Sequence, residues 1–329
     1  MIPLEYSAAV DAGEAVRGTT SPNPPVGCAL FDAGWEVIAT GGTSPAGGSH
    51  AEVNALDAAG ERARGATAVV TLEPCNHTGR TGPCAQALAD AGVATVIYLT
   101  ADPNPVASGG ADYLREGGVD VRYEPHRVDA LQPWLSSVRH GRVSVTAKFA
   151  ASVDGFTAAP DGTSQWITGP TAREHVHEDR AKRDAIIVGT GTALADDPSL
   201  TARWPDGTLR ENQPRRVVVG KRKVPDGNLA RLGFEQYATP EEALRALWET
   251  GARDVLVEGG ASLTTSFLAL GVVDRVQAYA APLLLGGGRG VLAGALAQSL
   301  PGAPRFELTG VSVLGNDVLM EMERTCLQA

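Results

Sequence analysis

Hydrophobic positions in the first part of the chain change repeatedly between strand-like and helix-like spacing. Short runs rich in branched residues predict buried strands, and longer stretches with apolar residues three and four apart predict amphipathic helices. The expected helices cover residues 5–17, 51–59, 84–92 and the segment between the glycines at 109–110 and 117–118. The expected strands cover 26–31, 35–41, 66–72, 94–100 and 119–123, with a hairpin turn at Gly34 joining the first two. This alternation predicts an α/β fold in which helices cover both faces of a sheet.

The pattern breaks after residue 126 and then restarts. Residues 127–142 predict a helix broken by Pro133 with no partner strand, so we place a domain boundary at the end of this segment. Two domains, 1–142 and 143–329, are also what a length of 329 residues favours. In the second domain, strands are expected at 143–155, 184–192 (ending in a glycine turn), 215–220, 254–260 and 272–287. Helices are expected at 240–250 and 262–270, and a final hairpin is expected to turn at residues 315–317.

Composition and charge restrict the class of protein. A hydrophobic content of 43% with 39 glycines is typical of globular proteins. The formal net charge of −10 argues against broad binding to nucleic acid or to anionic membranes, although a few arginines could hold a small anion. The first residues lack the basic flank of a secretory signal, and no uncharged apolar run approaches the roughly 20 residues that span a bilayer. We therefore expect a cytoplasmic protein, with Cys28 as a buried filler and Cys326 as a free surface thiol.

Two of the four cysteines lie together in "TLEPCNHTGRTGPC" (71–84), downstream of "HAEVNAL". Cys75 and Cys84 could form a disulfide, fill a core, or bind a metal with His50, and the expected compartment disfavours the disulfide. Three ligands of this kind suit a catalytic zinc, which leaves its fourth position to water. Glu52, at the start of an expected helix, could then transfer protons. This is the H-x-E and P-C pattern of zinc-dependent nucleobase deaminases.

Two observations qualify the pattern. Eight residues separate Cys75 from Cys84, where the general deaminase pattern has two. His77 is a possible fourth ligand, which would make a zinc ion purely structural. A packed histidine with two buried thiols is the remaining alternative. It does not explain why His50, Glu52 and Cys75 each lie at the edge of an expected helix or strand.

Features of the second half allow two interpretations each. The stretch "DVLVEGGASLTTSF" (254–267) is either a phosphate site at a helix start or an ordinary strand–glycine–helix connection. The basic segment 209–225 is either a charged strand edge or a site for a nucleotide 2′-phosphate. His175 and His177 point to different faces of an expected helix, so we interpret them as a solvated surface rather than a metal site. The cations of the basic segment are Arg210, Arg215, Arg216, Lys221, Arg222 and Lys223.

Taken together, the motifs resemble the bifunctional deaminase/reductase family of riboflavin biosynthesis. The first half carries "SPNPPVGC", "HAEVNAL" and "TLEPCNHTGRTGPC", and the second carries "KFAASVDG", "SQWITG", "LADDPSLTAR" and "VEGG" in the family's order. The resemblance implies an N-terminal three-layer domain like cytidine deaminase and a C-terminal domain like dihydrofolate reductase. It also implies zinc-dependent hydrolytic deamination of 2,5-diamino-6-ribosylamino-4(3H)-pyrimidinone 5′-phosphate. NADPH would then reduce the ribosyl to a ribityl side chain, in an enzyme that is a homo-oligomer.

The same resemblance implies roles for individual residues. His50, Cys75 and Cys84 would bind zinc, Glu52 would transfer protons, and Asn23 would lie at the pyrimidine pocket. The implied NADPH contacts are Ala150, Trp166, Thr192, Asp196, Gly260, Ala261, Ser262, Leu263, Thr264, Thr265 and Ser266. The implied substrate contacts are Ser164, Arg180, Leu200, Arg203 and Glu258, with Lys148 near the reacting sugar. The two arginines suit a phosphate group.

The chain departs from the family pattern at two places. Gly42 and Thr43 stand where the family usually has an aromatic residue and a histidine, and Gly220-Lys221 stands where it commonly has Asp-Ser. The contacts made by these segments are therefore left open. Three alternatives to the whole interpretation are deamination of nucleic-acid bases such as tRNA adenosine, a purely structural zinc, and a degenerate reductase half. The acidic balance and the reductase-like half disfavour the first.

Overall fold

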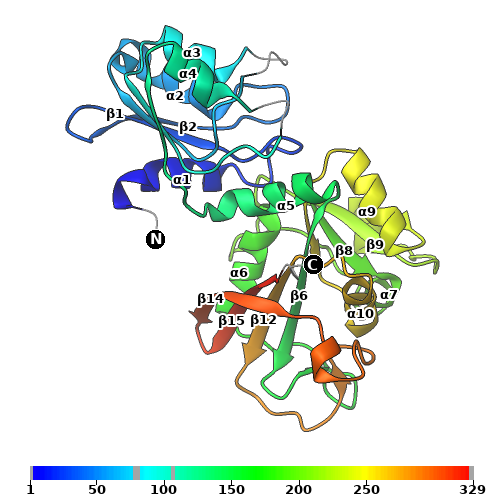
Figure 1. The fold of residues 1–329 in the computed structure, drawn as a ribbon. Helices are drawn as coiled ribbons and strands as arrows, with labels where there is room; N and C mark the ends of the chain where they lie inside the picture. Colours follow the sequence, from blue (N-terminus) through cyan, green and yellow to red (C-terminus); the bar gives the residue numbers. More distant parts are fainter. Residues whose placement is uncertain (1–2, 77–81, 105–107, 326–329) are drawn as a thin grey trace. The chain divides into compact units, whose positions relative to one another are not determined.

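The computed structural model describes residues 3–76, 82–104 and 108–325, and the chain forms two compact units, Met1–Gly141 and Arg142–Ala329 (Figure 1). Two positions considered above, His77 and Cys326, lie outside the described residues. None of the described helices combines the length and the apolar content that crossing a membrane requires.

The N-terminal unit is built on a five-stranded mixed sheet with the order β2-β1-β3-β4-β5. β1 pairs antiparallel with both β2 and β3, whereas β3, β4 and β5 are parallel to one another. The pairing of β1 with β2 confirms the hairpin predicted around Gly34. The strands are β1 (Gly27–Phe31), β2 (Val37–Gly42), β3 (Thr67–Val70), β4 (Thr95–Tyr98) and β5 (Asp120–Tyr123).

Helices cover both faces of this sheet, as the alternating pattern predicted (Figure 1). A Cβ on Gly27 would lie 1.9 Å from the carbonyl oxygen of Ala9 in α1, and a Cβ on Gly41 would lie 2.4 Å from that of Ala51 in α2. Gly27 pairs with Gly42, the neighbour of Gly41, so the two glycines point to opposite faces and admit one helix each. The helices are α1 (Ser7–Ala15), α2 (Ala51–Ala59), α3 (Cys84–Asp90), α4 (Gly110–Glu116) and α5 (Gln132–His140). Short 3-10 turns occur at Leu4–Tyr6, Gly60–Ala63 and Asp129–Leu131.

The last helix of this unit differs from its prediction. Pro133 lies in the first turn of α5, where a missing backbone N–H costs nothing, and so it does not break the helix. The preceding residues form a separate 3-10 turn. Within the unit, Trp134 Nε1 donates a hydrogen bond of 3.1 Å to the carbonyl oxygen of Pro22 and so ties α5 to the loop before β1.

The C-terminal unit contains an eight-stranded sheet with the order β10-β9-β8-β11-β6-β12-β15-β14. The first six strands in this order are parallel to one another. β15 pairs antiparallel with both β12 and β14, and β14 and β15 form the predicted terminal hairpin. The strands are β6 (Ser144–Ser152), β8 (Ala185–Gly189), β9 (Arg215–Val219), β10 (Glu235–Tyr237), β11 (Asp254–Val257), β12 (Arg275–Ala281), β14 (Phe306–Leu314) and β15 (Asp317–Arg324). A separate pair joins β7 (Phe156–Ala158) and β13 (Arg289–Gly290). The helices are α6 (Pro170–Ala181), α7 (Thr190–Asp196), α8 (Asn228–Leu232), α9 (Pro240–Glu249) and α10 (Ala261–Ala269), with a 3-10 turn at Leu300–Gly302.

The direction in which the chain crosses this sheet reverses between β8 and β11. From β8 the chain moves outward to β9 and β10, whereas from β11 it moves to β12 on the far side of β6. α7 follows β8 directly, where the sequence predicted only a glycine turn, and α10 follows β11. In open parallel sheets, ligands bind where two such connections part, outside the carboxyl ends of the strands.

The basic strand β9 lies inside the sheet, so its interpretation as a charged edge is wrong. It pairs with β8 on one side and β10 on the other. Arg215 forms a paired contact with Glu235 on β10, with nitrogen–oxygen distances of 2.8 Å. Arg216 donates to the carbonyl oxygen of Ser199 at 3.0 Å. The side chains of these two arginines therefore already have hydrogen-bond partners within the fold.

Candidate active sites

Three potential metal ligands meet in the N-terminal unit. His50 is the N-cap of α2, Cys75 lies in the loop after β3, and Cys84 begins α3. The Sγ atoms of Cys75 and Cys84 lie 3.6 and 3.3 Å from Nδ1 of His50. All three ligand atoms lie within 4.8 Å of one another, and both cysteines are free thiols. One histidine nitrogen and two cysteine sulfurs fit a tetrahedral zinc ion with one position left for water.

The electrostatics of the cluster favour a thiolate. The backbone N–H of Cys84 points to Sγ of Cys75 at 3.5 Å. The hydrogen bond from the Cys84 thiol, helped by the nearby His50, lowers the pKa of Cys75 to about 4. Because the thiolate is the form of cysteine that binds metals, the geometry prepares Cys75 as a ligand.

Glu52 lies one residue into α2 beside this cluster. Its side chain is buried, with a relative exposure of 4%, and it forms no ion pair among the described residues. Burial is the main cause that raises its pKa to about 7. A carboxyl group with a pKa near neutrality can both accept and release a proton at physiological pH, which is what a proton shuttle requires.

The loop before His50 is held by backbone and side-chain contacts. Asn54 Nδ2 donates to the carbonyl oxygen of Gly42 at 2.7 Å and to Ser44 Oγ at 3.0 Å. Thr43, one of the departures from the family pattern, is buried, and its Oγ1 accepts from the backbone N–H of Val26 at 3.2 Å. The Thr43 side chain is thus engaged by the loop that leads into β1.

The loop that carries Cys75 is fastened to α4. Oε1 of Glu73 accepts hydrogen bonds from the backbone N–H groups of Gly109 at 3.2 Å and Ala111 at 3.4 Å. A Cβ on Gly110 would lie only 1.8 Å from the carbonyl oxygen of Pro74, so only glycine permits this approach. Roles for these residues were not predicted from the sequence, although Glu73 and Pro74 stand within the "EPC" motif itself.

Two further residues considered in the sequence, Asn23 and Cys28, lie in the N-terminal unit. Asn23 lies, half-buried, in the turn between α1 and β1, where its backbone N–H donates to the carbonyl oxygen of Thr20 at 3.0 Å. No hydrogen bond among the described residues joins Asn23 to the metal cluster. Cys28 is fully buried in β1, as predicted.

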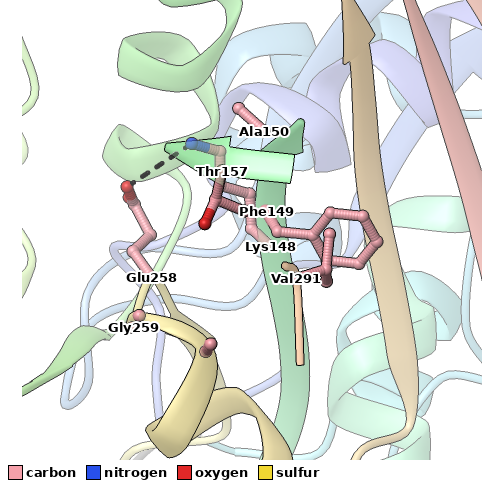
Figure 2. Close-up of a pocket in the computed structure, with 9 residues that line it drawn as sticks. Lys148, Phe149, Ala150, Thr157, Glu258, Gly259 and Val291 are labelled. Carbon is pink, nitrogen blue, oxygen red and sulfur yellow. Dashed lines mark ion pairs between the residues drawn. The ribbon is translucent and has the colours of Figure 1, made fainter. Parts of the chain in front are cut away.

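A pocket in the C-terminal unit lies between β6, β7 and the start of α10 (Figure 2). Its lining residues are Lys148, Phe149, Ala150, Thr157, Glu258, Gly259, Gly260, Ala261 and Val291. Five of them were candidates from the sequence: Lys148, Ala150, Glu258, Gly260 and Ala261. Phe149 and Gly259 are their immediate neighbours along the chain. Thr157 and Val291 were missed because the small pair of β7 and β13 has no clear hydrophobic pattern.

The pocket contains two opposite charges. Figure 2 shows the ammonium of Lys148 facing the Glu258 carboxylate, and these atoms lie 3.9 Å apart. Arg180 forms two hydrogen bonds to the same carboxylate, at 2.7 and 2.8 Å. Burial by itself would raise the pKa of Glu258, but the guanidinium of Arg180 lowers it below its usual value. Burial also lowers the pKa of Lys148.

The substrate contacts Ser164, Leu200 and Arg203 and the cofactor contact Trp166, all implied by the resemblance, lie in two loops. Ser164 and Trp166 are exposed in the loop before α6, where the guanidinium carbon of Arg173 lies 4.6 Å from the centre of the Trp166 ring. Leu200 is buried, and Arg203 is exposed with no carboxylate partner among the described residues. Arg203 therefore presents a free guanidinium to an anion.

The implied cofactor contacts gather around α7 and α10. Asp196 is the last residue of α7, and Thr192 lies in its first turn. A Cβ on Gly260 would lie 3.6 Å from Thr192 Oγ1, so the starts of the two helices are adjacent. The hydroxyl groups of Thr265 and Ser266 donate to the carbonyl oxygens of Ala261 and Ser262 within α10. That of Thr264 donates to the carbonyl oxygen of Gly259, just before the helix. The part of this helix that lines the pocket is its start, at Gly260 and Ala261.

The two histidines on α6 are half-buried, so their interpretation as a solvated surface is wrong. Nδ1 of His175 lies 2.8 Å from the hydroxyl of Tyr279, and Nδ1 of His177 lies 3.0 Å from the carbonyl oxygen of Thr201. Burial, reinforced by the charge of Arg180, lowers the pKa of His177 to about 4. His177 is therefore neutral at pH 7 and packs as part of the fold.

Comparison with known proteins gives three similarities in sequence. Residues 143–320 match the family model of the RibD C-terminal domain, and residues 5–100 match the cytidine and deoxycytidylate deaminase zinc-binding region. The riboflavin biosynthesis protein RibD of Corynebacterium ammoniagenes is 60% identical over 303 residues, which are 90% of each chain.

Two solved structures resemble the whole chain. RibD of Acinetobacter baumannii is 35% identical, with a TM-score of 0.84 over 98% of this chain and 99% of that chain. A diaminohydroxyphosphoribosylaminopyrimidine deaminase/5-amino-6-(5-phosphoribosylamino)uracil reductase of Thermotoga maritima is 31% identical, with a TM-score of 0.86 over 97% of both chains. The predicted fold class, a deaminase-like α/β region followed by a reductase domain, is confirmed.

Proposed function

This chain belongs to the RibD family, the bifunctional deaminase/reductases of riboflavin biosynthesis, and from that membership we propose how its residues divide the work. Residues 1–142 carry the deaminase and residues 143–329 carry the reductase. The observation that supports this division best is the meeting of His50, Cys75 and Cys84 beside a buried Glu52, in the unit that does not contain the Lys148–Glu258 pocket. Family membership favours a small pyrimidine substrate over deamination of nucleic-acid bases.

In the deaminase, the chain's own residues hold the metal and move the protons. His50, Cys75 and Cys84 would hold a zinc ion, which would supply a Lewis acid that activates water at neutral pH. Glu52 takes one proton from water as its oxygen attacks the amine-bearing carbon of the pyrimidine and passes that proton to the ring nitrogen; it then takes the second proton from the new hydroxyl group and passes it to the leaving amine. Ammonia departs, and a carbonyl group replaces the amine. The proposed substrate is 2,5-diamino-6-ribosylamino-4(3H)-pyrimidinone 5′-phosphate.

In the reductase, bound NADPH would supply the hydride that converts the ribosyl group to a ribityl side chain at C1′. Lys148 and Glu258 carry opposite charges and face each other in the pocket. Both would hydrogen bond to the sugar as its ring oxygen gains a proton. Arg180 fixes the Glu258 carboxylate through two hydrogen bonds, which leaves Arg203 as the better ligand for the substrate phosphate.

The start of α10 suits the diphosphate of the cofactor. Gly259 and Gly260 follow β11 without side chains, and the first backbone N–H groups of a helix attract anions. Ala150, Trp166, Thr192 and Asp196 remain the proposed contacts of the rest of the cofactor. A homo-oligomeric state and a cytoplasmic location also remain part of this proposal.

A coupled assay tests both halves. The diaminopyrimidine ribotide is incubated with the zinc-loaded enzyme and NADPH, and ammonia release and NADPH oxidation are followed separately. We expect ammonia release without NADPH, and NADPH oxidation only after deamination has begun. A chain that releases ammonia but neither binds nor oxidises NADPH would show that its reductase half is degenerate.

A further inference from the structure

The ammonium group of Lys148 lies over the face of an aromatic ring as well as beside a carboxylate. Its Nζ atom is 5.3 Å from the centre of the Tyr279 ring and 3.9 Å from Oε2 of Glu258. A cation within about 6 Å of a ring centre is attracted to the ring face, and the attraction is strongest where water is excluded. Tyr279 has a relative exposure of 1%, so the contact is made away from bulk water.

The register of two parallel strands brings this ring to the pocket. β6 and β12 are neighbours in the sheet, with Lys148 paired to Gln277 and Ala150 paired to Tyr279. Side chains two residues apart on a strand point to the same face of the sheet, and so do the side chains of paired residues. Lys148 and Tyr279 therefore share one face. An aromatic residue one position earlier or later on β12 would point to the opposite face.

The ring of Tyr279 is held in place by its neighbours. Its hydroxyl group lies 2.8 Å from Nδ1 of His175 on α6. The ring packs in a buried cluster with Ala172 of α6 and Leu319 of β15. Burial raises the pKa of Tyr279, so the phenol stays uncharged at neutral pH and forms no ion pair with Lys148. The attraction that this residue offers to the ammonium is therefore that of its ring face.

The charge of Lys148 depends on opposing influences. Burial is the main cause that lowers its pKa, and Arg180 on α6 lowers it further. Glu258, directly after β11, and Asp179 on α6 raise it. Arg180 also takes two hydrogen bonds of the Glu258 carboxylate, so that this anion is shared between two cations. The ring of Tyr279 adds an attraction that offsets part of the burial, because it favours the charged form of the amine.

We propose that Tyr279 is a positioning residue of the reductase, whose ring holds the Lys148 ammonium in place and keeps it charged beside Glu258. This inference rests on the proposed reductase function. A charged donor forms the stronger hydrogen bond, so an ammonium stabilises a sugar oxygen that gains a proton better than a neutral amine does. Tyr279 itself lies behind Lys148 in the core and acts through it.

The pKa of Lys148 can be measured without an assay of activity. Only the neutral amine reacts with acetic anhydride, and the Lys148 side chain keeps an exposure of 16% through which the reagent can reach it. Competitive acylation over a series of pH values, read by mass spectrometry of a digest, gives one curve for each lysine. In Tyr279→Leu, we expect the pKa of Lys148 to fall by about 0.5–1.5 units, because the ring no longer favours the ammonium. The chain has four lysines to resolve: Lys148, Lys182, Lys221 and Lys223.

Two further variants separate the ring from the hydroxyl group and from the loss of any tyrosine. Tyr279→Phe keeps the ring face but loses the contact with His175, so it should hold the pKa of Lys148 within a few tenths of a unit. Tyr237→Leu on β10, where the hydroxyl group contacts Glu235, should leave Lys148 unchanged. In reduction of the deaminated compound, the alkaline limb of kcat should move to lower pH in Tyr279→Leu, and Tyr279→Phe should restore it.

The outcomes separate this inference from the function on which it rests. If the pKa of Lys148 in Tyr279→Leu stays the same or rises, the role of the ring is refuted while the reductase assignment stands. If that pKa falls but the pH profile of reduction does not move, the ring does not act in the reaction. If the wild-type protein does not reduce the deaminated compound, the reductase assignment itself fails, and acylation still tests the contact. If a thermal melt shows Tyr279→Leu to be unfolded, Tyr279→Met takes its place, with a shift in the same direction expected.

Discussion

Replacing Glu52 by glutamine should separate the two activities of this enzyme. The amide has nearly the same shape as the carboxyl group, and burial already holds the pKa of Glu52 at about 7, so about half of the metal-free protein carries the neutral form at pH 7. We therefore expect Glu52→Gln to fold and to keep zinc on its three ligands. The amide cannot carry protons, and loss of a positioned proton carrier typically costs about 10²–10⁴ in rate. That loss corresponds to roughly 2.7–5.4 kcal/mol of transition-state stabilisation.

Three measurements on one preparation decide the matter: zinc content, ammonia release from the diaminopyrimidine ribotide, and NADPH oxidation with the deaminated compound. Asp57→Asn is the matched control, because Asp57 is exposed on the same helix and should leave all three values unchanged. A zinc-loaded Glu52→Gln enzyme that releases ammonia within a few fold of the wild-type rate would refute the role of Glu52. Loss of NADPH oxidation as well, in a folded and zinc-loaded variant, would refute the independence of the two sites.

Three further predictions concern the metal, the packing and the pH dependence of stability. Removal of zinc by a chelator should abolish ammonia release but leave NADPH oxidation with the deaminated compound, and restored zinc should recover the first activity. Gly110→Ala should destabilise the protein by about 1–3 kcal/mol, because its Cβ would lie 1.8 Å from the carbonyl oxygen of Pro74. Gly117→Ala at the other end of α4, where the nearest atom is 3.4 Å away, should change the melting temperature much less. The unfolded chain protonates His177 below about pH 6.5 and the folded chain only near pH 4, so this residue makes the free energy of unfolding fall as the pH drops through that range. Urea unfolding at pH 7 and pH 5 should show a smaller decrease for His177→Gln, and an equal decrease would contradict this.

The local pattern of the chain was sufficient for much of the fold. The helix predicted at 51–59 matches α2, and the hairpin around Gly34 and the terminal hairpin both form. These elements have strong periodicity and clear end signals. The errors occurred where one signal has two meanings: Pro133 begins a helix as readily as it breaks one, and the glycine-bearing stretch after β8 begins α7.

The motifs of the chain were enough to propose which types of residue carry the chemistry, because histidine, cysteine and glutamate at characteristic spacings can be recognised locally. They did not determine which strand lies beside which. The order of the parallel strands, set by long-range packing, places β9 inside the sheet and brings the turn after it against α7. The same packing places Glu258 beside both Lys148 and Arg180, residues distant in the chain, and so fixes the charge of the pocket. Only the tertiary structure could decide these contacts, since hydrophobic burial selects the pairing of whole elements and no single residue encodes it.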